Sequence, residues 1–284
     1  YTDDGGTGEQ VTSNATETVT VYVAPANLDY FFRFGTTTEG NPIPNLTGWD
    51  TSNVTSMKGT FSGASEFNQD IGNWATSTVT NMSFMFSEAA LFNQFIGDWN
   101  TSSVSDFKYM FGGADTFNQS ITNWTTSSAL DMSFMFNEAT SFNQYIGDWD
   151  VSSVYDFDSM FRGADAFNRD IGGWAPLAAT EMQYMFYGAD VFNQDIGHWD
   201  TSSVTNMSHM FGGAALFNQD IADWDTSSVT NMKEMFAGAV SFDQSLEVLE
   251  IQTVSNMIEM LSNSGLSTAN YDKTLVGWYQ QATT

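Results

Sequence analysis

Aspartates recur at fixed positions of a 25-residue sequence repeat, and their carboxylates are the groups in this chain best suited to chemistry. Asp195 and Asp220 share one position in adjacent repeats, and Asp200 and Asp225 share another. If the repeats stack about 4.8 Å apart, as strands in a sheet do, like charges meet within each pair. A calcium ion with oxygen ligands relieves such repulsion, so these four residues are candidates for a calcium site. Because the chain has no compact calcium-binding loop, solvated carboxylates are the competing interpretation.

Patterns of enzymatic chemistry are otherwise missing from the sequence. The two histidines, His198 and His209, belong to no metal-binding or Ser-His-Asp pattern, and we expect both to be solvated. The chain contains no phosphate-binding loop and no dinucleotide fingerprint. Single carboxylates occur throughout, and nothing marks two of them as a glycosidase-like pair. The sequence therefore predicts a protein without enzymatic activity or an organic cofactor.

A column of asparagines indicates a structural role rather than a ligand site. Asparagine holds one position in seven successive repeats, and its amide carries both donors and an acceptor. Such a side chain can satisfy turn backbone in its own repeat and in the next one. The predicted structural ladder consists of Asn68, Asn93, Asn118, Asn143, Asn168, Asn193 and Asn218.

Tryptophans fix the length of the repeat. They recur every 25 residues from Trp49 to Trp224. A constant period of this length is typical of a stacked array, in which no unit buries its apolar face alone. Apolar residues make up 42% of the chain, enough for a continuous core. Most of the chain is therefore predicted to be a solenoid.

The apolar residues within one repeat are spaced as on one face of a helix. They predict a short helix over 79–89, with Thr80 as its N-cap. Gly-Ala pairs such as Gly163-Ala164 indicate close packing near the end of each helix. The stripe, about 120° wide at helical pitch, consists of Val79, Met82, Met85, Phe86 and Ala89.

The remainder of the repeat predicts one short strand per coil, over 92–96, paired into a parallel sheet down one side. The expected fold is an α/β repeat solenoid, leucine-rich-repeat-like, with about eight to nine coils, each a short strand plus a short helix. Residues 1–45 form a mobile leader and an N-terminal β cap, 46–265 form the solenoid, and 266–284 form a C-terminal helical cap. In that cap, Ser267 or Thr268 starts a helix that lays Leu275 and Trp278 on the open end of the core.

Charge and composition narrow the classes of partner. The chain has 34 acidic and 7 basic residues and a formal charge of −27, which argues against nucleic acids and anionic membranes. No apolar run reaches transmembrane length, and no cysteine is present. The first residue is Tyr rather than Met, which favours a processed, secreted protein. Sequons agree with that localisation, and the candidate glycosylation sites are Asn14, Asn45, Asn53, Asn81, Asn100, Asn118, Asn123 and Asn206.

The repeat resembles that of the BspA-type leucine-rich-repeat surface proteins of bacteria. The unit Phe-Asn-Gln-Asp-Ile-Gly-Asn-Trp-Asp-Thr-Ser-Ser-Val-Thr-Asn-Met-Ser-x-Met-Phe-x-Gly-Ala carries the resemblance and is clearest over 217–239. The segment 265–278 is similar to the end of that array, and the match covers about 46–278. The resemblance implies a secreted or cell-surface protein that functions in adhesion or protein binding. Phe, Met, Trp and Ile fill the core columns here, which departs from classical leucine-rich repeats.

Two functions follow as expectations. The first is a non-enzymatic extracellular repeat protein that binds other proteins or surface glycans. The second is a structural subunit of an extracellular filament that assembles head to tail with copies of itself. Its first candidate for a contact is the alternating strand with Val19, Val21 and Val23 on one face, which either caps the array or adds to a neighbour.

Overall fold

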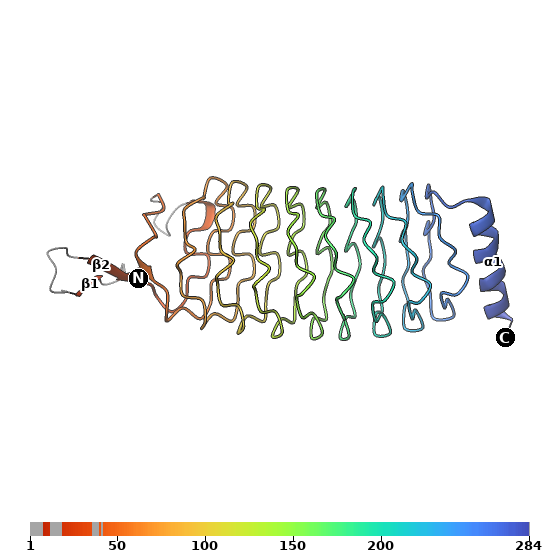
Figure 1. The fold of residues 1–284 in the computed structure, drawn as a ribbon, viewed down its shortest axis with the longest axis horizontal. Coiled ribbons are helices and arrows are strands. Elements are labelled where there is room, and N and C mark those ends of the chain that lie inside the picture. Colours follow the sequence, from red (N-terminus) through yellow and green to blue (C-terminus); the bar gives the residue numbers. More distant parts are fainter. Residues whose placement is uncertain (1–7, 12–18, 36–39, 41, 284) are drawn as a thin grey trace.

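The protein is a long stack of similar coils that ends in one helix (Figure 1). The computed structural model describes residues 8–11, 19–35, 40 and 42–283. Its regular elements, in chain order, are strands β1 (Gly8–Val11) and β2 (Val19–Val23), the short 3-10 helix η1 (Arg33–Gly35), strand β3 (Trp49–Asp50) and helix α1 (Thr268–Ala282). β1 pairs with β2 in antiparallel fashion, and β2 pairs with β3 in parallel.

Successive coils are joined through backbone bridges one period apart. A parallel bridge joins Asn81 to Asp106 and Asp106 to Asp131, and the series runs from Asn27 to Asn256. Each coil therefore repeats the path of the coil before it, and the predicted repeat architecture is confirmed. The bridges begin at Asn27, so coil-to-coil pairing already exists upstream of Leu46.

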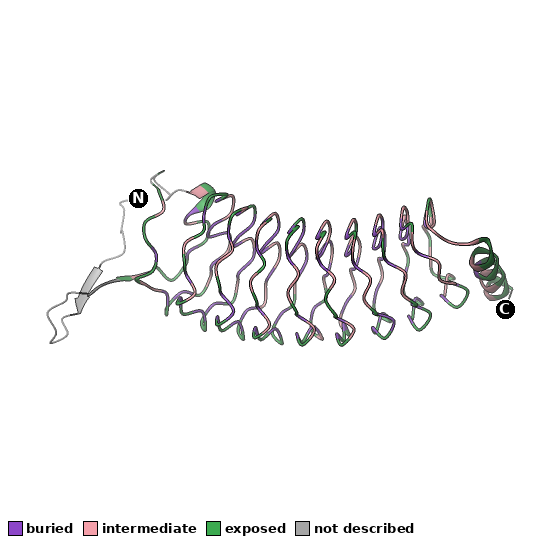
Figure 2. Ribbon diagram, turned by 45° about the horizontal axis from the view of Figure 1, so that its top comes forward, coloured by how far each residue is buried: buried purple, intermediate pink, exposed green. Residues whose placement is uncertain are grey.

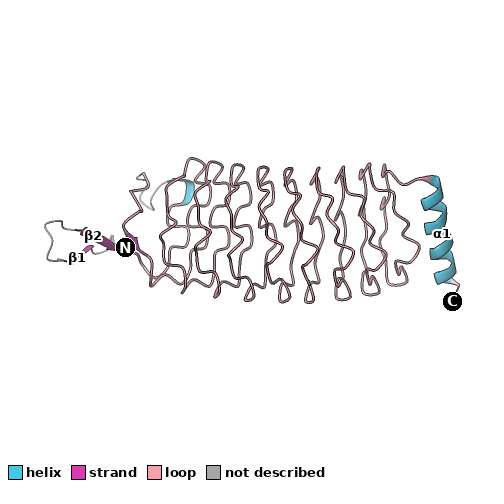
Figure 3. Cartoon of the chain, viewed as in Figure 1, coloured by secondary structure: helices cyan, strands magenta, loops and turns pink. Residues whose placement is uncertain are grey.

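The predicted helix in each coil is wrong. Within 79–89 the structure has consecutive tight turns over 83–88 and no helix, and Figure 3 shows every coil between β3 and α1 as loop. The backbone N–H groups of Met85, Ser87 and Ala89 donate to the carbonyl oxygens three residues back, at 3.0–3.2 Å. The N–H groups of the alternate residues leave the coil and donate to the next one, as from Phe84 to the Lys108 carbonyl oxygen at 2.8 Å.

Left-handed residues explain why these segments do not form helices. Phe84 has φ of 59° and Glu88 has φ of 58°, values that interrupt a right-handed helix and suit the third residue of a type II turn. The glycines of most Gly-Ala pairs occupy the Glu88 position with φ between 64° and 74°. These glycines therefore supply turns along the array rather than close packing at a helix end.

The predicted strand over 92–96 is also absent. Those residues form no strand in any coil, and the parallel bridges lie instead at the Asn81 position, inside the segment predicted to be helical. The α/β description with one strand and one helix per coil is therefore incorrect. An apolar residue at every third position fits tight turns as well as it fits a helix, which is why the spacing was ambiguous.

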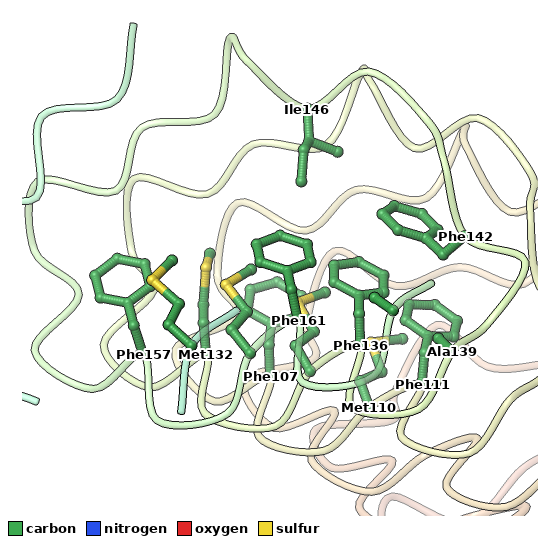
Figure 4. Packing of buried hydrophobic residues seen from close by; sticks show 14 of the residues in the cluster. Phe107, Met110, Phe111, Met132, Phe136, Ala139, Phe142, Ile146, Phe157 and Phe161 are labelled. Carbon is green, nitrogen blue, oxygen red and sulfur yellow. The ribbon is translucent and has the colours of Figure 1, made fainter. Parts of the chain in front are cut away.

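Stacked aromatic rings fill the interior of the coils. Within one coil the rings of Phe136 and Phe142 lie 3.9 Å apart, and Phe136 lies 5.7 Å from Phe161 in the next coil (Figure 4). The Trp149 indole Nε1–H donates to the Ile121 carbonyl oxygen at 3.3 Å, and the other array tryptophans from Trp74 to Trp224 repeat that bond. Buried and exposed segments alternate around each coil (Figure 2), so one core runs through the stack.

Helix α1 substitutes for a further coil at the C-terminal end. Ser267 is its N-cap, and the Trp278 Nε1–H donates to the Leu246 carbonyl oxygen at 2.9 Å, the bond that array tryptophans make. The Thr274 hydroxyl accepts the Leu246 N–H at 3.0 Å. Trp278 packs against the core as predicted from the sequence, whereas Leu275 remains 44% exposed.

The asparagine column forms a continuous hydrogen-bonded ladder. The Asn193 side-chain oxygen accepts the Asn218 backbone N–H at 2.9 Å and the Gln219 side-chain N–H at 2.9 Å. The same backbone bond links every neighbouring pair from Asn68 to Asn218. Asp243 takes the final position and accepts the Ser267 N–H at 2.7 Å. The ladder therefore connects the first full coils to α1.

Replacing Asn193 with Ala should lower the free energy of unfolding by about 1–2 kcal/mol, because the Asn218 N–H loses its acceptor. Asn193→Asp keeps the acceptor oxygen, as Asp243 does at the end of the ladder, and should cost less. Thermal and denaturant unfolding of both variants measures the difference. Equal losses would show that the side-chain oxygen is not what stabilises the coil.

Candidate functional site

The four aspartates proposed from the sequence are exposed and bond within their own turns. The Asp195 and Asp220 side chains accept the backbone N–H two residues ahead, at 3.0 and 2.9 Å. Asp200 and Asp225 do the same and also accept the hydroxyl of the serine two residues ahead, at 2.6 Å. The serine hydrogen bonds lower the pKa of Asp200 and Asp225 from their ordinary value. These carboxylates therefore have a local role in shaping the turns.

The described residues contain no group of three or more His, Asp or Glu side chains arranged to hold a metal ion. The aspartates aligned along the stack thus recur as one carboxylate per coil rather than as a converging ligand set. No further support for calcium comes from their geometry.

The sequons lie on the outside of the stack where they are described. Asn45, Asn53, Asn100 and Asn123 are exposed, and Asn14 lies outside the described residues. The Asn45 and Asn100 oxygens accept backbone N–H groups within their own turns. The Asn118 oxygen belongs to the asparagine ladder, whereas those of Asn81 and Asn206 accept backbone N–H groups within their own turns.

His209 is not solvated as the sequence led us to expect. Its side chain is buried, its ring stacks on Tyr184 at 4.4 Å, and its Nδ1 lies 3.5 Å from a Glu234 carboxylate oxygen. Desolvation lowers its pKa from the ordinary value, against the opposing effect of Glu234. His198 is exposed.

His209 belongs to a column of rings along one outer face of the stack, which we call the outer aromatic column. Phe84 stacks on Tyr109 at 5.5 Å, and Tyr109 stacks on Phe134 at 5.6 Å. Tyr184 and His209 continue the column after an interruption. These rings are placed by the left-handed turn residues, because each occupies the Phe84 position of its coil with φ between 55° and 59°.

Ser159 interrupts the outer aromatic column with a small side chain that is only 3% exposed. It has the same left-handed backbone, with φ of 54°, and its hydroxyl bonds to the Asp158 carboxylate at 2.7 Å. A pocket of about 340 Å³ lies at this point, lined by Phe134, Asp158, Ser159, Arg162 and Tyr184. We call this pocket the ring slot.

Polar groups surround the ring slot. The Arg162 guanidinium forms an ion pair with Glu138 at 2.8 Å and donates to the Asn137 side-chain oxygen at 3.2 Å. It also lies 5.9 Å from the centre of the Tyr187 ring. The slot therefore has aromatic residues on its two sides along the stack, and a cation and a carboxylate beside them. Aligning the repeats would have revealed this site, because the alignment places aromatic residues one or two periods apart in one column. These residues are Phe84, Tyr109, Phe134 and Tyr184.

A column of acids runs through the same outer face. The bridge residues Asp106, Asp131, Asp156 and Glu181 follow one another in successive coils. Burial, and to a lesser degree the neighbouring Asp131 and Asp158, raise the pKa of Asp156 from its ordinary value. The Asp156 side chain still accepts the Asp158 backbone N–H at 2.9 Å, as asparagines do at this position in other coils.

The comparison with protein families identifies the repeat. The chain matches the family described as "Mycoplasma protein of unknown function, DUF285" over residues 27–141, 119–200 and 177–278. The chain belongs to this family. The three DUF285 matches overlap and together span nearly all of the coils, in agreement with the period-by-period bridges. No curated protein matches the chain.

Within the described part of this DUF285 protein, no helix is both long and apolar enough to cross a membrane.

Replacing Asp156 with Asn should stabilise the protein at neutral pH by up to about 1 kcal/mol, because it removes a half-buried like charge and keeps the turn hydrogen bond. Since folding raises the pKa of Asp156, its ionisation destabilises the fold as pH rises through that pKa. The gain should therefore vanish in acid, where Asp156 is protonated. Unfolding of the wild type and the variant, measured at neutral pH and in acid, tests the prediction. A gain in stability that persists unchanged in acid would contradict it.

Proposed function

We propose that this protein is a non-enzymatic binding protein that captures one sugar ring of a surface glycan in the ring slot. The observation that carries the proposal is the missing ring at Ser159 between Phe134 and Tyr184. Neighbouring rings in the outer aromatic column stack about 5.5 Å apart, so a ring entering the gap would stack on both flanking residues.

The chemistry beside the slot favours a sugar over an aromatic side chain. Arg162 supplies hydrogen-bond donors, and the Asp158 carboxylate supplies acceptors close to the Ser159 hydroxyl. A pyranose has an apolar face for the rings and hydroxyl groups at its edge for these polar atoms. An aromatic side chain of a partner protein fits the rings but leaves the polar groups unmatched. Nucleic-acid bases are disfavoured by the charge of −27.

The setting proposed for this activity is extracellular, at the cell surface or in the secreted fraction. The support is the resemblance of the repeat to BspA-type leucine-rich-repeat surface proteins, together with several exposed sequons. In that setting, the protein would function in adhesion by binding glycans or proteins, with the ring slot as the binding site.

A filament subunit is the second proposed function, and its original candidate contact was the strand with Val19, Val21 and Val23. In the structure β2 pairs with β1 along one edge, and Tyr22 and Val23 pair with β3 on the other. The strand is thus engaged by its own chain, which favours a capping role for it. Support for a filament comes instead from the two ends of the stack.

Replacing Ser159 with Tyr should lower the affinity for the glycan at least about tenfold without harming the fold. Aromatic residues occupy this left-handed position in other coils, so a tyrosine should complete the column and raise the free energy of unfolding by roughly 0.5–1.5 kcal/mol. A glycan array identifies the sugar, and calorimetric titration of that sugar measures the affinity of each variant.

His209→Tyr is the matched control, because it exchanges the imidazole ring on the far side of Tyr184 for a phenol ring and leaves the slot open. It should bind as the wild type does. A wild type that binds no glycan, or a Ser159→Tyr variant that binds as tightly as the control, would contradict the proposal. Binding of aromatic peptides alone would identify a protein partner instead.

A further inference from the structure

The C-terminal end of the stack presents a row of backbone donors. In every inner coil, N–H groups at alternate positions donate to the following coil, as from Phe236 to the Met260 carbonyl oxygen at 2.9 Å. Beyond the last described coil the chain continues as helix α1 rather than as a further coil. Within the described residues, the N–H groups of Met257, Glu259 and Leu261 donate to no acceptor. Each leaves a strong hydrogen-bonding group unpaired within the chain.

The N-terminal end presents the matching row of acceptors. Residues 24–34 form half a coil, because Leu28, Tyr30 and Phe32 donate to the carbonyl oxygens of 56, 58 and 60 at 2.8–3.0 Å. By the pattern of the stack, the carbonyl groups of Asn27, Asp29 and Phe31 are the ones that a preceding coil would contact. They accept no hydrogen bond from the described residues.

Side chains at the two ends continue the same columns. Leu28 and Phe32 stand in register with Met57 and Phe61 of the first full coil, and the Phe32 ring stacks on Phe61 at 5.5 Å. At the other end Met257 and Leu261 hold those two positions. Beside them an open, largely apolar pocket of about 520 Å³ lies between the last coil and α1, and its lining includes Met257, Met260, Leu261, Tyr271, Leu275 and Trp278.

The two ends of the stack are covered in different ways. Helix α1 covers the side of the last coil that contains Asp243 and Leu246, and it leaves the turn side at 257–263 open. At the N-terminal end, residues 24–34 donate to residues 50–62 on the turn side, and β2 pairs with β3 beside them.

We propose that the protein assembles head to tail, with residues 27–33 of one copy docked on residues 257–263 of the next. The three free donors then meet the three acceptors in the register that each inner coil uses, and the partly buried Phe31 faces Met257 and Leu261. The occupant of the apolar pocket is a second copy of this chain, because the contact continues the coil-to-coil interface of the stack. The contact is heterologous, so it does not close and yields a fibre. It does not depend on the ring slot.

Charge sets the conditions for assembly. Each copy carries a formal charge of −27, so copies repel one another at low ionic strength. Salt screens that repulsion without weakening the apolar contact. Polymers should therefore lengthen as salt is raised.

Sedimentation velocity and electron microscopy of the full chain at low and high salt test the proposal. The wild type should form unbranched fibres whose mean mass rises with protein concentration and salt. Leu261→Asp places a charge in the docking face and should leave monomers. Leu216→Asp makes the same change on the side of the stack, where Leu216 is 51% exposed, and should polymerise like the wild type.

The head-to-tail direction of the contact gives a second readout, which a misfolded variant would not reproduce. Leu261→Asp keeps an intact N-terminal end, so a small fraction of it mixed with wild type should terminate growth and shorten the fibres at least severalfold. Circular dichroism melting verifies that the variant is folded. A wild type that stays monomeric in high salt, or Leu261→Asp polymers as long as those of Leu216→Asp, would overturn the proposal.

Discussion

Every inner coil depends on the next one for half of the backbone hydrogen bonds in its turn segment. Met82, Phe84, Phe86 and Glu88 donate to the neighbouring coil at 2.7–3.0 Å, and only the residues between them bond within the coil. An isolated coil would leave those groups unpaired, which is costly wherever water is excluded. The constant 25-residue period follows from this constraint, because a coil of another length would displace donors from acceptors and rings from rings.

Much of the architecture was predictable from the spacing of residues, but the local backbone was not. The tryptophan period and the asparagine column specify coils in register, and Trp278 marks the final cap. The helix over 79–89 failed because apolar residues every third position fit tight turns equally well. Recurrent glycines with positive φ, as at Gly63 and Gly113, were the distinguishing signal. The ring slot was missed because a single residue, Ser159, defines it. That residue stands out only when the repeats are aligned and the column of aromatic residues becomes visible.

The same register connects architecture to the proposed activities. Stacking turns any repeated outer residue into a column, so a single substitution such as Ser159 creates a pocket between rings that the neighbouring coils already hold apart. At the ends of the stack, the backbone groups that would bond to a further coil lack that partner in the described part of the chain. Helix α1 satisfies the Leu246 side of the last coil but not its turn side, whereas ordinary capping would cover both. Binding along the side and assembly at the ends are therefore separable.

Removal of one whole coil tests the central claim most directly. Excision of residues 117–141 joins Thr116 to Phe142 and restores every column in register, whereas excision of residues 117–128 removes half a period and places donors opposite side chains. Thermal unfolding followed by circular dichroism compares the two proteins. We expect cooperative unfolding close to that of the full chain after the first excision, and loss of the cooperative transition after the second. Equal stability of the two proteins would contradict an architecture held together by coil-to-coil hydrogen bonds.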